Sequence, residues 1–167
     1  MLNVAARILL KSVPPTAATT HSSLNYVSRS VVTLKAKIYT ATATASGQGR
    51  NGQVESNGLK LKLGTPKEMG GTGVGENPEQ LFAMGYAGCL LGAVQLMARQ
   101  QGKNEMADRA VIYTSVSIGT PNELPGVALA VDIKVEGVDD EALKAGHEFC
   151  PYSRALTHGV VVNVSKA

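Results

Sequence analysis

The stretch between Gln80 and Ala98 contains no charged residue, and this feature constrains the fold of the chain more than any other. Asn77 is a good helix N-cap, Pro78 suits the first helical position, and Gly102 is a typical helix terminator. The sequence therefore predicts one helix from about 77 to 101. Its length approaches that of a membrane span, but Gln95 and several glycines interrupt it. We expect a buried central helix, with a membrane span as the minor alternative.

Segments of alternating polar and apolar residues lie on both sides of this helix and predict strands. The expected strands are 31–45, a short one before residue 57, 59–63, 110–118, 127–135 and 160–164, with a second helix over about 139–149. The pair Asn57-Gly58 is a strong hairpin signal. The glycine-rich loop 64–76 lacks the spacing of a dinucleotide-binding motif. This order predicts an α+β fold with a mainly antiparallel sheet.

Residues 1–30 have the composition of a targeting sequence, and we assign the folded domain to residues 31–167. The segment contains Arg7, Lys11 and Arg29 and is rich in Ser and Thr, while the first acidic residue of the chain is Glu55. A helix would place Arg7 and Lys11 on one face, opposite apolar residues. We expect a mitochondrial transit peptide and a matrix location. The alternative is a disordered tail without a targeting signal.

The composition of the body narrows the classes of function. The chain has 16 basic and 13 acidic residues, and because three of the basic ones lie in the leader, the body is formally neutral. Nucleic-acid binding needs a clustered basic face, so we expect no nucleic-acid partner. Two cysteines are too few for a disulfide scaffold or a cysteine-only zinc site. They are either a redox pair or two inert thiols.

Cys89 lies in the apolar helix, where burial would make a thiol inert. If the helix broke at Gly85 or Gly88, Cys89 would start a new helix, whose N-terminus would favour the thiolate. Cys150 precedes Pro151 at the end of the second helix, where a thiol can move, as a resolving cysteine requires. His147 and the two cysteines have no familiar metal-ligand spacing, so we expect no metal site.

Several motifs together resemble the organic hydroperoxide resistance proteins, a branch of the superfamily that also contains the OsmC proteins. The resemblance covers roughly 34–165, in the order of that family. Its motifs are Tyr39–Ala45, Gly49–Gly52, Thr65–Gly71, Asn77–Phe82, Gly85–Cys89 and His147–Ser153. The segment Ser153–Leu156 is more similar to the OsmC branch, so an OsmC-type peroxidase with broader substrate choice is one alternative. A non-catalytic thiol redox sensor or binding protein on the same fold is the other.

The resemblance implies a thiol peroxidase for organic hydroperoxides, with Cys89 as peroxidatic and Cys150 as resolving cysteine. It also implies that Arg50 holds the Cys89 thiolate and that Glu79 orients Arg50. The thiolate would release an alcohol, become a sulfenic acid, and form a disulfide with Cys150. The resemblance further implies an intertwined homodimer with active sites at its interface, no cofactor, and a lipoylated protein as reductant.

The positions of Glu79 and Cys89 set a geometric condition on this site. In one straight helix, ten residues span about 15 Å, too far for one Arg50 to reach both. Either the helix breaks near Gly85–Gly88, or the groups come from two chains of a dimer. We expect the break, because each glycine weakens a helix by roughly 1 kcal/mol relative to alanine.

Overall fold

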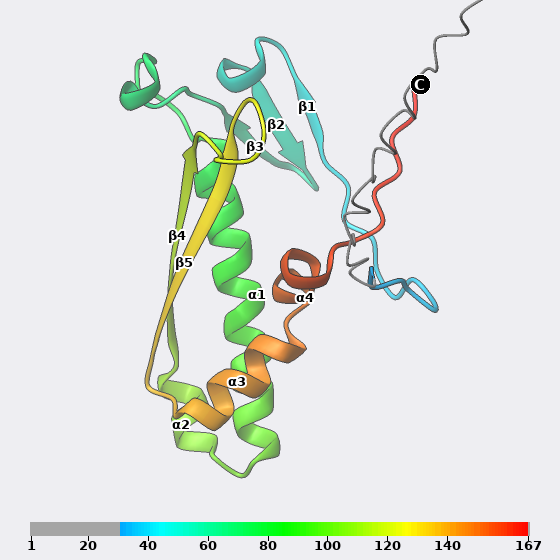
Figure 1. The fold of residues 1–167 in the computed structure, drawn as a ribbon, viewed down its shortest axis with the longest axis vertical. Coiled ribbons are helices and arrows are strands. Elements are labelled where there is room, and N and C mark those ends of the chain that lie inside the picture. Colours follow the sequence, from blue (N-terminus) through cyan, green and yellow to red (C-terminus); the bar gives the residue numbers. More distant parts are fainter. Residues whose placement is uncertain (1–30, 167) are drawn as a thin grey trace, which may run out of the picture.

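The computed structural model describes residues 31–166. The leader predicted for residues 1–30 lies outside the described residues, so its boundary and its mitochondrial destination remain predictions. The elements follow the predicted α+β order, but they form two separate antiparallel sheets, β1-β2-β3 and β4-β5, on a long central helix. Figure 1 shows the helix α1 with the β4–β5 hairpin along it and the three-stranded sheet near its N-terminal end.

The central helix α1 runs without a break from Pro78 to Gln100. Asn77 caps it in a capping box with Gln80, and Gly102, with a φ of 76°, follows its end, as predicted. The expected break at Gly85–Gly88 is wrong. Packing on other elements decides helix stability in proteins more than local propensity does, and α1 packs on β4, α2, α3 and α4.

The hairpin of β4 (Val111–Gly119) and β5 (Ala128–Glu136) covers one side of α1. Its antiparallel register pairs Val111 with Glu136 and Gly119 with Ala128. Alternate residues of the hairpin face α1 and complete a core cluster. The buried members of this cluster are Tyr86, Leu90, Ala93, Val94, Ala110 and Cys150. Cys150 is thus part of the main core.

Helix α3 (Asp140–Phe149) crosses α1 on another side and is followed at once by α4 (Pro151–His158). Asp139 caps α3, in agreement with the expected helix start. The crossing is close, because a Cβ added at Gly146 would lie 2.5 Å from Val94 Cγ2 and 2.6 Å from Val94 Cα. Helix α4 and the short helix α2 (Asn104–Arg109) were not predicted from the sequence. Pro151 at the first position of α4 is the signal that could have revealed it.

The smaller sheet contains β1 (Thr44–Ser46), β2 (Gln53–Ser56) and β3 (Leu59–Lys62). The predicted turn between β2 and β3 is present, with φ of 48° at Asn57 and 84° at Gly58. The loop that follows carries a short 3-10 turn, Lys67–Met69, and leads into α1.

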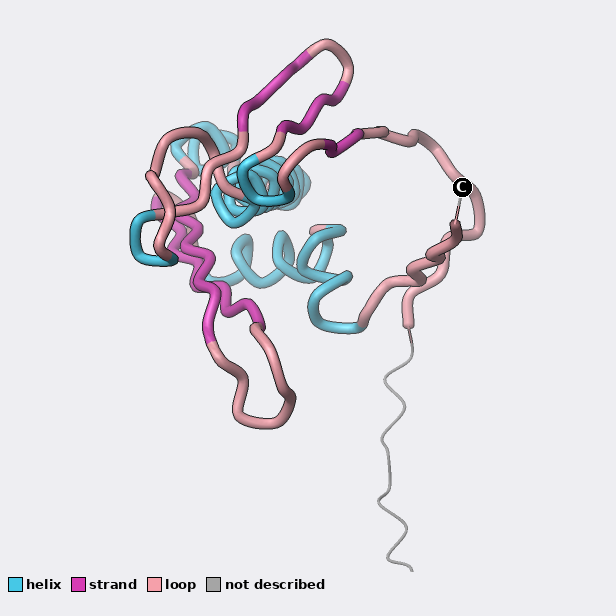
Figure 2. The backbone as a smooth tube through the Cα atoms, turned by 90° about the horizontal axis from the view of Figure 1, so that it is seen from above, coloured by secondary structure: helices cyan, strands magenta, loops and turns pink. Residues whose placement is uncertain are grey.

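The two predicted outer strands are mostly absent. Of 31–45, only the last two residues belong to β1, and of 160–164, only Val160 pairs, in a parallel bridge to Val32. Figures 1 and 2 show both segments lying away from the helices. Ile38 is fully exposed and Val164 is 91% exposed. An alternating segment becomes a strand only where it pairs with a neighbouring strand, and within residues 31–166 the rest of these two segments pairs only through that bridge.

Among residues 31–166, α1 is the helix that is long and apolar enough to cross a membrane, with a mean hydropathy of 1.6 over its best window. One such helix is weak evidence, because the central helix of a soluble protein has the same length and composition. Here its buried residues pack on α3 and β4.

Candidate active site

The two thiols lie next to each other, although 61 positions separate them in the sequence. The Sγ atoms of Cys89 and Cys150 are 3.6 Å apart, and both cysteines are free thiols. Cys150 is fully buried, whereas Cys89 is only half-buried. A disulfide has an S–S distance of about 2.05 Å, so a small side-chain movement can join the two sulfurs. Peroxide or reductant from solvent meets Cys89 first.

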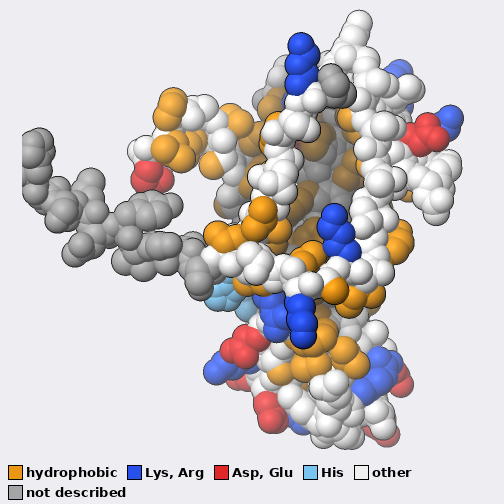
Figure 3. Space-filling model, turned by 90° about the vertical axis from the view of Figure 1, so that its right-hand side faces the viewer, with side chains coloured by type: hydrophobic (Ala, Val, Ile, Leu, Met, Phe, Trp, Pro, Cys, Tyr) orange, Lys and Arg blue, Asp and Glu red, His pale blue; other side chains and the backbone are white. Residues whose placement is uncertain are grey.

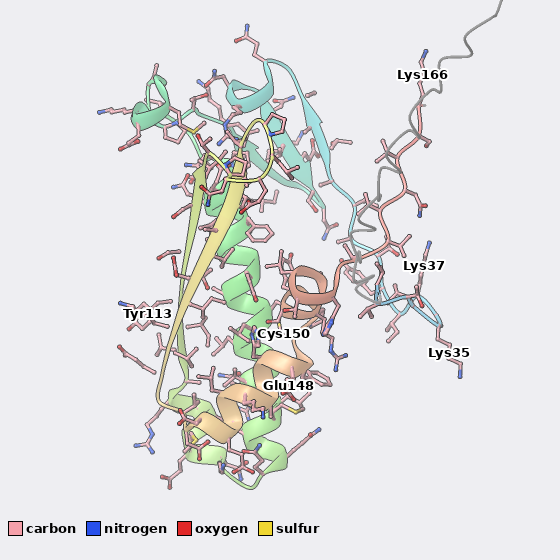
Figure 4. All side chains as sticks on the ribbon, viewed as in Figure 1. Lys35, Lys37, Tyr113, Glu148, Cys150 and Lys166 are labelled. Atoms are coloured by element: carbon pink, nitrogen blue, oxygen red, sulfur yellow. The ribbon has the colours of Figure 1, made fainter. Side chains whose placement is uncertain are left out.

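Cys150 occupies the corner between α3 and α4 (Figure 4). Its N–H donates to the Gly146 carbonyl at 2.9 Å, and its own carbonyl accepts from the Arg154 N–H at 3.0 Å. The Arg154 side chain also donates to the Glu148 carbonyl at 2.7 Å and stacks on Phe149. The backbone at Cys150 is thus bonded on both sides, so a movement of this thiol toward Cys89 would be one of its side chain.

The N-terminus that faces Cys89 belongs to α4 and not to a second half of α1. The backbone N–H of Tyr152, in the first turn of α4, donates to the Cys89 sulfur and lowers its pKa. Burial and the neighbouring Cys150 thiol act more strongly in the opposite direction, and together they raise the pKa of Cys89 above its usual value. Within one chain, Cys89 is therefore placed for disulfide formation but is not activated as a thiolate.

A second pair of predicted residues meets at the N-terminal end of α1. Arg50, in the 3-10 turn Gly49–Asn51, donates through Nη2 to Oε2 of Glu79, in the first turn of α1. This hydrogen bond holds the pKa of Glu79 below its usual value. The Nε atom of Arg50 is buried and has no hydrogen-bond partner among the described residues.

The structure brings the four predicted residues together as two separate pairs. Because α1 is unbroken, the ten positions from Glu79 to Cys89 span about 15 Å along its axis. Within the described part of the chain, no hydrogen bond or ion pair links Arg50 to Cys89. The single chain thus holds the sulfur pair and the ion pair at different places on α1.

Three aromatic rings that the sequence did not mark as site residues form a cluster between α1 and α4. Tyr86 stacks on Tyr152 at 5.7 Å between ring centroids, and Phe82 contacts both rings. A Cβ added at Gly85 would come within 3.1 Å of the Tyr152 hydroxyl, so this glycine leaves room for the ring. The spacing of Phe82 and Tyr86, one helical turn apart and just before Cys89, is the signal that could have found them.

An open groove of about 850 Å³ lies between β5, α3 and α4. Apolar side chains of β5 and of α1 line one side, and Asp140, Lys144 and His147 of α3 line another. Neither cysteine lines it, so in the single chain it is not the chamber in which the sulfurs react. Figure 3 shows a hollow on one face of the molecule, with hydrophobic side chains in it and around it.

Residues 31–166 contain no cluster of three or more His, Cys, Asp or Glu side chains with the geometry of a metal site. His147 is exposed on α3 and lines the groove.

Comparisons with known proteins identify the family. The model of the OsmC-like protein family matches residues 70–165. An organic hydroperoxide resistance protein of Xanthomonas axonopodis pv. citri is 41% identical over 137 residues, which cover 78% of this chain and 95% of that protein. The chain therefore belongs to the OsmC/Ohr family, where Ohr stands for organic hydroperoxide resistance, and the resemblance noted in the sequence is confirmed.

Solved structures agree with this assignment. An organic hydroperoxide resistance protein of Legionella pneumophila matches with a TM-score of 0.66 and 38% identity, over 75% of this chain and 94% of that one. OhrB of Bacillus subtilis, also an organic hydroperoxide resistance protein, matches with a TM-score of 0.63 and 34% identity, over 74% and 95% of the two chains. The α+β fold with its long central helix is thus the fold of this family.

Proposed function

We propose that this protein is a thiol peroxidase that reduces organic hydroperoxides to alcohols and contributes to resistance to oxidative stress. The observation that carries the proposal is the 3.6 Å distance between the Cys89 and Cys150 sulfurs. This sulfur pair lies in a chain whose relatives, named above, are organic hydroperoxide resistance proteins.

The cycle uses Cys89 as the peroxidatic and Cys150 as the resolving cysteine. The Cys89 thiolate attacks the outer oxygen of the hydroperoxide, the O–O bond breaks, and the alkoxide leaves and takes up a proton as an alcohol. Cys150 then attacks the sulfur of the Cys89 sulfenic acid, the S–O bond breaks, and water leaves as the disulfide forms. A dithiol, for which a lipoylated protein is our candidate, reduces the disulfide and restores both thiols.

A homodimer with Arg50 acting on the partner's thiol is the second part of the proposal. A peroxidatic cysteine needs a lowered pKa, which a neighbouring cation can supply. In one chain the pKa of Cys89 is raised, and Arg50 is paired with Glu79 instead. The exposed apolar segments 31–43 and 160–166 are the surface that a second copy would cover. The unbroken α1 supports this arrangement, because within one chain Glu79 and Cys89 are too far apart along the helix for one Arg50 to contact both.

Turnover distinguishes this function from a redox sensor. We expect the wild-type protein to consume many equivalents of cumene hydroperoxide with dihydrolipoamide, whereas a sensor is oxidised once and stops. Cys89→Ser should abolish consumption. Cys150→Ser should reduce one equivalent and then accumulate over-oxidised Cys89, because nothing resolves the sulfenic acid.

The same assay separates the two branches of the family. A strong preference for cumene hydroperoxide over hydrogen peroxide supports an Ohr-type enzyme, and similar rates support an OsmC-type peroxidase. If Cys150→Ser turns over like the wild type, Cys150 is not the resolving cysteine.

We also propose that residues 1–30 direct the protein to the mitochondrial matrix, on the basis of their basic, acid-free composition. A reporter fused to residues 1–30 should enter mitochondria, and the mature protein should lack them. Full-length protein in the cytosol would contradict this proposal.

A further inference from the structure

A buried hydrogen bond joins the two helices that carry the thiols. The hydroxyl of Tyr86 on α1 lies 2.9 Å from Oγ of Ser153 on α4. Both residues are almost completely buried, with 3% and 2% of their surface exposed. Tyr86 lies three positions before Cys89, and Ser153 lies three positions after Cys150. The bond therefore sits about one helical turn away from each sulfur.

This bond fixes how the first turn of α4 sits on α1. Two hydroxyl groups so deeply buried are costly to leave without a partner, so any displacement of α4 that separates them is unfavourable. The neighbouring residue Tyr152 stacks on the ring of Tyr86 and gives its backbone N–H to Cys89. One residue of α1, Tyr86, thus contacts two consecutive positions of α4.

We propose that the hydrogen bond between Tyr86 and Ser153 positions α4, and with it Cys150, for disulfide formation with Cys89. This inference rests on the proposed peroxidase cycle and assigns two positioning residues to its second step. The backbone of Cys150 is already held at the corner between α3 and α4 by hydrogen bonds. The distance between Cys89 and Cys150 therefore depends on how that corner is placed against α1. Tyr86 and Ser153 make the side-chain hydrogen bond that sets this placement.

The chemical step affected is the attack of Cys150 on the sulfenic acid of Cys89. That step competes with attack by a second hydroperoxide molecule, which oxidises Cys89 to the sulfinic acid and releases a second alcohol. A displacement of about 1 Å at a reacting pair can slow a reaction by up to about 100-fold. Loosening α4 should therefore shift the sulfenic acid from disulfide toward sulfinic acid.

The test compares Tyr86→Phe, Ser153→Ala and the double variant with the full-length wild-type protein. At a fixed excess of cumene hydroperoxide with dihydrolipoamide, the measurement is the fraction of Cys89 converted to sulfinic acid per turnover, read by intact mass. We expect this fraction to rise about tenfold or more in all three variants. The ratio is independent of how fast the first oxidation occurs, so a change in thiolate formation does not affect it.

The double variant separates positioning from stability. Each single variant leaves one buried hydroxyl unpaired and should unfold at a lower temperature, whereas removing both hydroxyls restores much of the stability. A merely structural role predicts that over-oxidation returns to the wild-type level in the double variant, and a positioning role predicts that it stays high. Tyr113→Phe is the matched control, because it removes a tyrosine hydrogen bond, to Glu136, on the hairpin away from Cys150 (Figure 4).

If the double variant converts the same fraction of Cys89 to sulfinic acid per turnover as the wild type does, the positioning role is wrong. The peroxidase proposal would then remain intact. A wild-type protein without multiple turnovers would instead refute the proposed function itself.

Discussion

The two ends of the proposed site differ in what one chain supplies. Around Cys150, one chain supplies the geometry for disulfide formation. The backbone is bonded on both sides, the thiol is fully buried, and its partner sulfur is 3.6 Å away. At the N-terminal end of α1, Arg50 and Glu79 form an ion pair that does not reach either thiol. Residues 31–43, which lead into β1, are exposed, and among the described strands they form one β-bridge, at Val32.

This difference separates two requirements of a peroxidatic cysteine. The geometry for disulfide formation depends on the packing of α1, α3 and α4, which a single chain provides. The charge that lowers the pKa of the thiol must come from elsewhere, since in one chain burial raises it. Sulfur placement is thus local to the fold, whereas in the mechanism we propose activation comes from the second copy.

Removing the charge should have the largest effect. We expect Arg50→Ala to raise the pKa of Cys89 in the assembled protein, because the cation that favours the thiolate is lost. The rate constant for hydroperoxide attack at neutral pH should fall by about tenfold or more as the thiolate fraction decreases. The measurement is the pH dependence of Cys89 alkylation and of peroxide reduction.

Mixed dimers show whether Arg50 acts across the interface. Arg50→Ala and Cys89→Ser homodimers should both be poorly active. A mixed dimer of the two should regain one working site if Arg50 acts on the partner's thiol, and none if it acts within its own chain. Wild-type alkylation and peroxide kinetics in Arg50→Ala would show that this ion pair does not activate the thiol.

The distance between the Cys89 and Cys150 sulfurs should be sensitive to the close crossing of α1 and α3. In Gly146→Ala, the new Cβ would meet backbone atoms of Val94 at 2.6 Å and 2.9 Å, so α3 must move. We expect a loss of about 1–3 kcal/mol in the free energy of unfolding, typical of overpacking. Because Cys150 ends α3, disulfide formation after one equivalent of hydroperoxide should also slow.

Gly92→Ala is the control for this variant, because it adds the same methyl group to a helix at a position with no atom within 4 Å. It should stabilise α1 slightly, in line with the higher helix propensity of alanine. Equal stability and disulfide rates in Gly146→Ala and wild type would mean that the crossing does not control the distance between the sulfurs.

The sequence was sufficient wherever local rules decide the structure. Asn77, Pro78 and Gly102 gave the bounds of α1, Asn57-Gly58 gave the β2–β3 turn, and Asp139 gave the start of α3. The motifs also selected the two cysteines that meet in space. Each of these inferences depends on a few neighbouring residues or on a resemblance of motifs.

The sequence was insufficient wherever tertiary packing decides. Gly85 and Gly88 predicted a break, but packing keeps α1 continuous, and Gly85 instead leaves room for Tyr152. Segments 31–43 and 160–164 have strand patterns, but in the described chain they form only the bridge between Val32 and Val160. The bond between Tyr86 and Ser153 joins residues 67 positions apart, and no local pattern indicates it.

Removing the ion pair between Arg50 and Glu79 should give the smallest effect of the three. It can be measured as a change in the pH dependence of the free energy of unfolding. Because the Arg50 hydrogen bond lowers the pKa of Glu79, the pair stabilises the folded state above the ordinary glutamate value of 4.5. That stabilisation is lost as pH falls through the lowered pKa of the folded protein. For a pair with Arg50 one-third exposed, we expect about 1 kcal/mol.

Glu79→Gln isolates this contribution, because it keeps the shape of the side chain and a hydrogen-bond acceptor for Arg50 but removes the charge. Urea unfolding should show the variant less stable than wild type at neutral pH, with the two curves converging below pH 4.5 as Glu79 is protonated. Glu55→Gln is the control, since Glu55 pairs with Lys60 at the exposed surface and should change little. A constant difference between Glu79→Gln and wild type at all pH values would assign the loss to packing. If the ion pair also orients Arg50 toward a partner's Cys89, Glu79→Gln should slow peroxide attack less than Arg50→Ala does, since the cation itself remains.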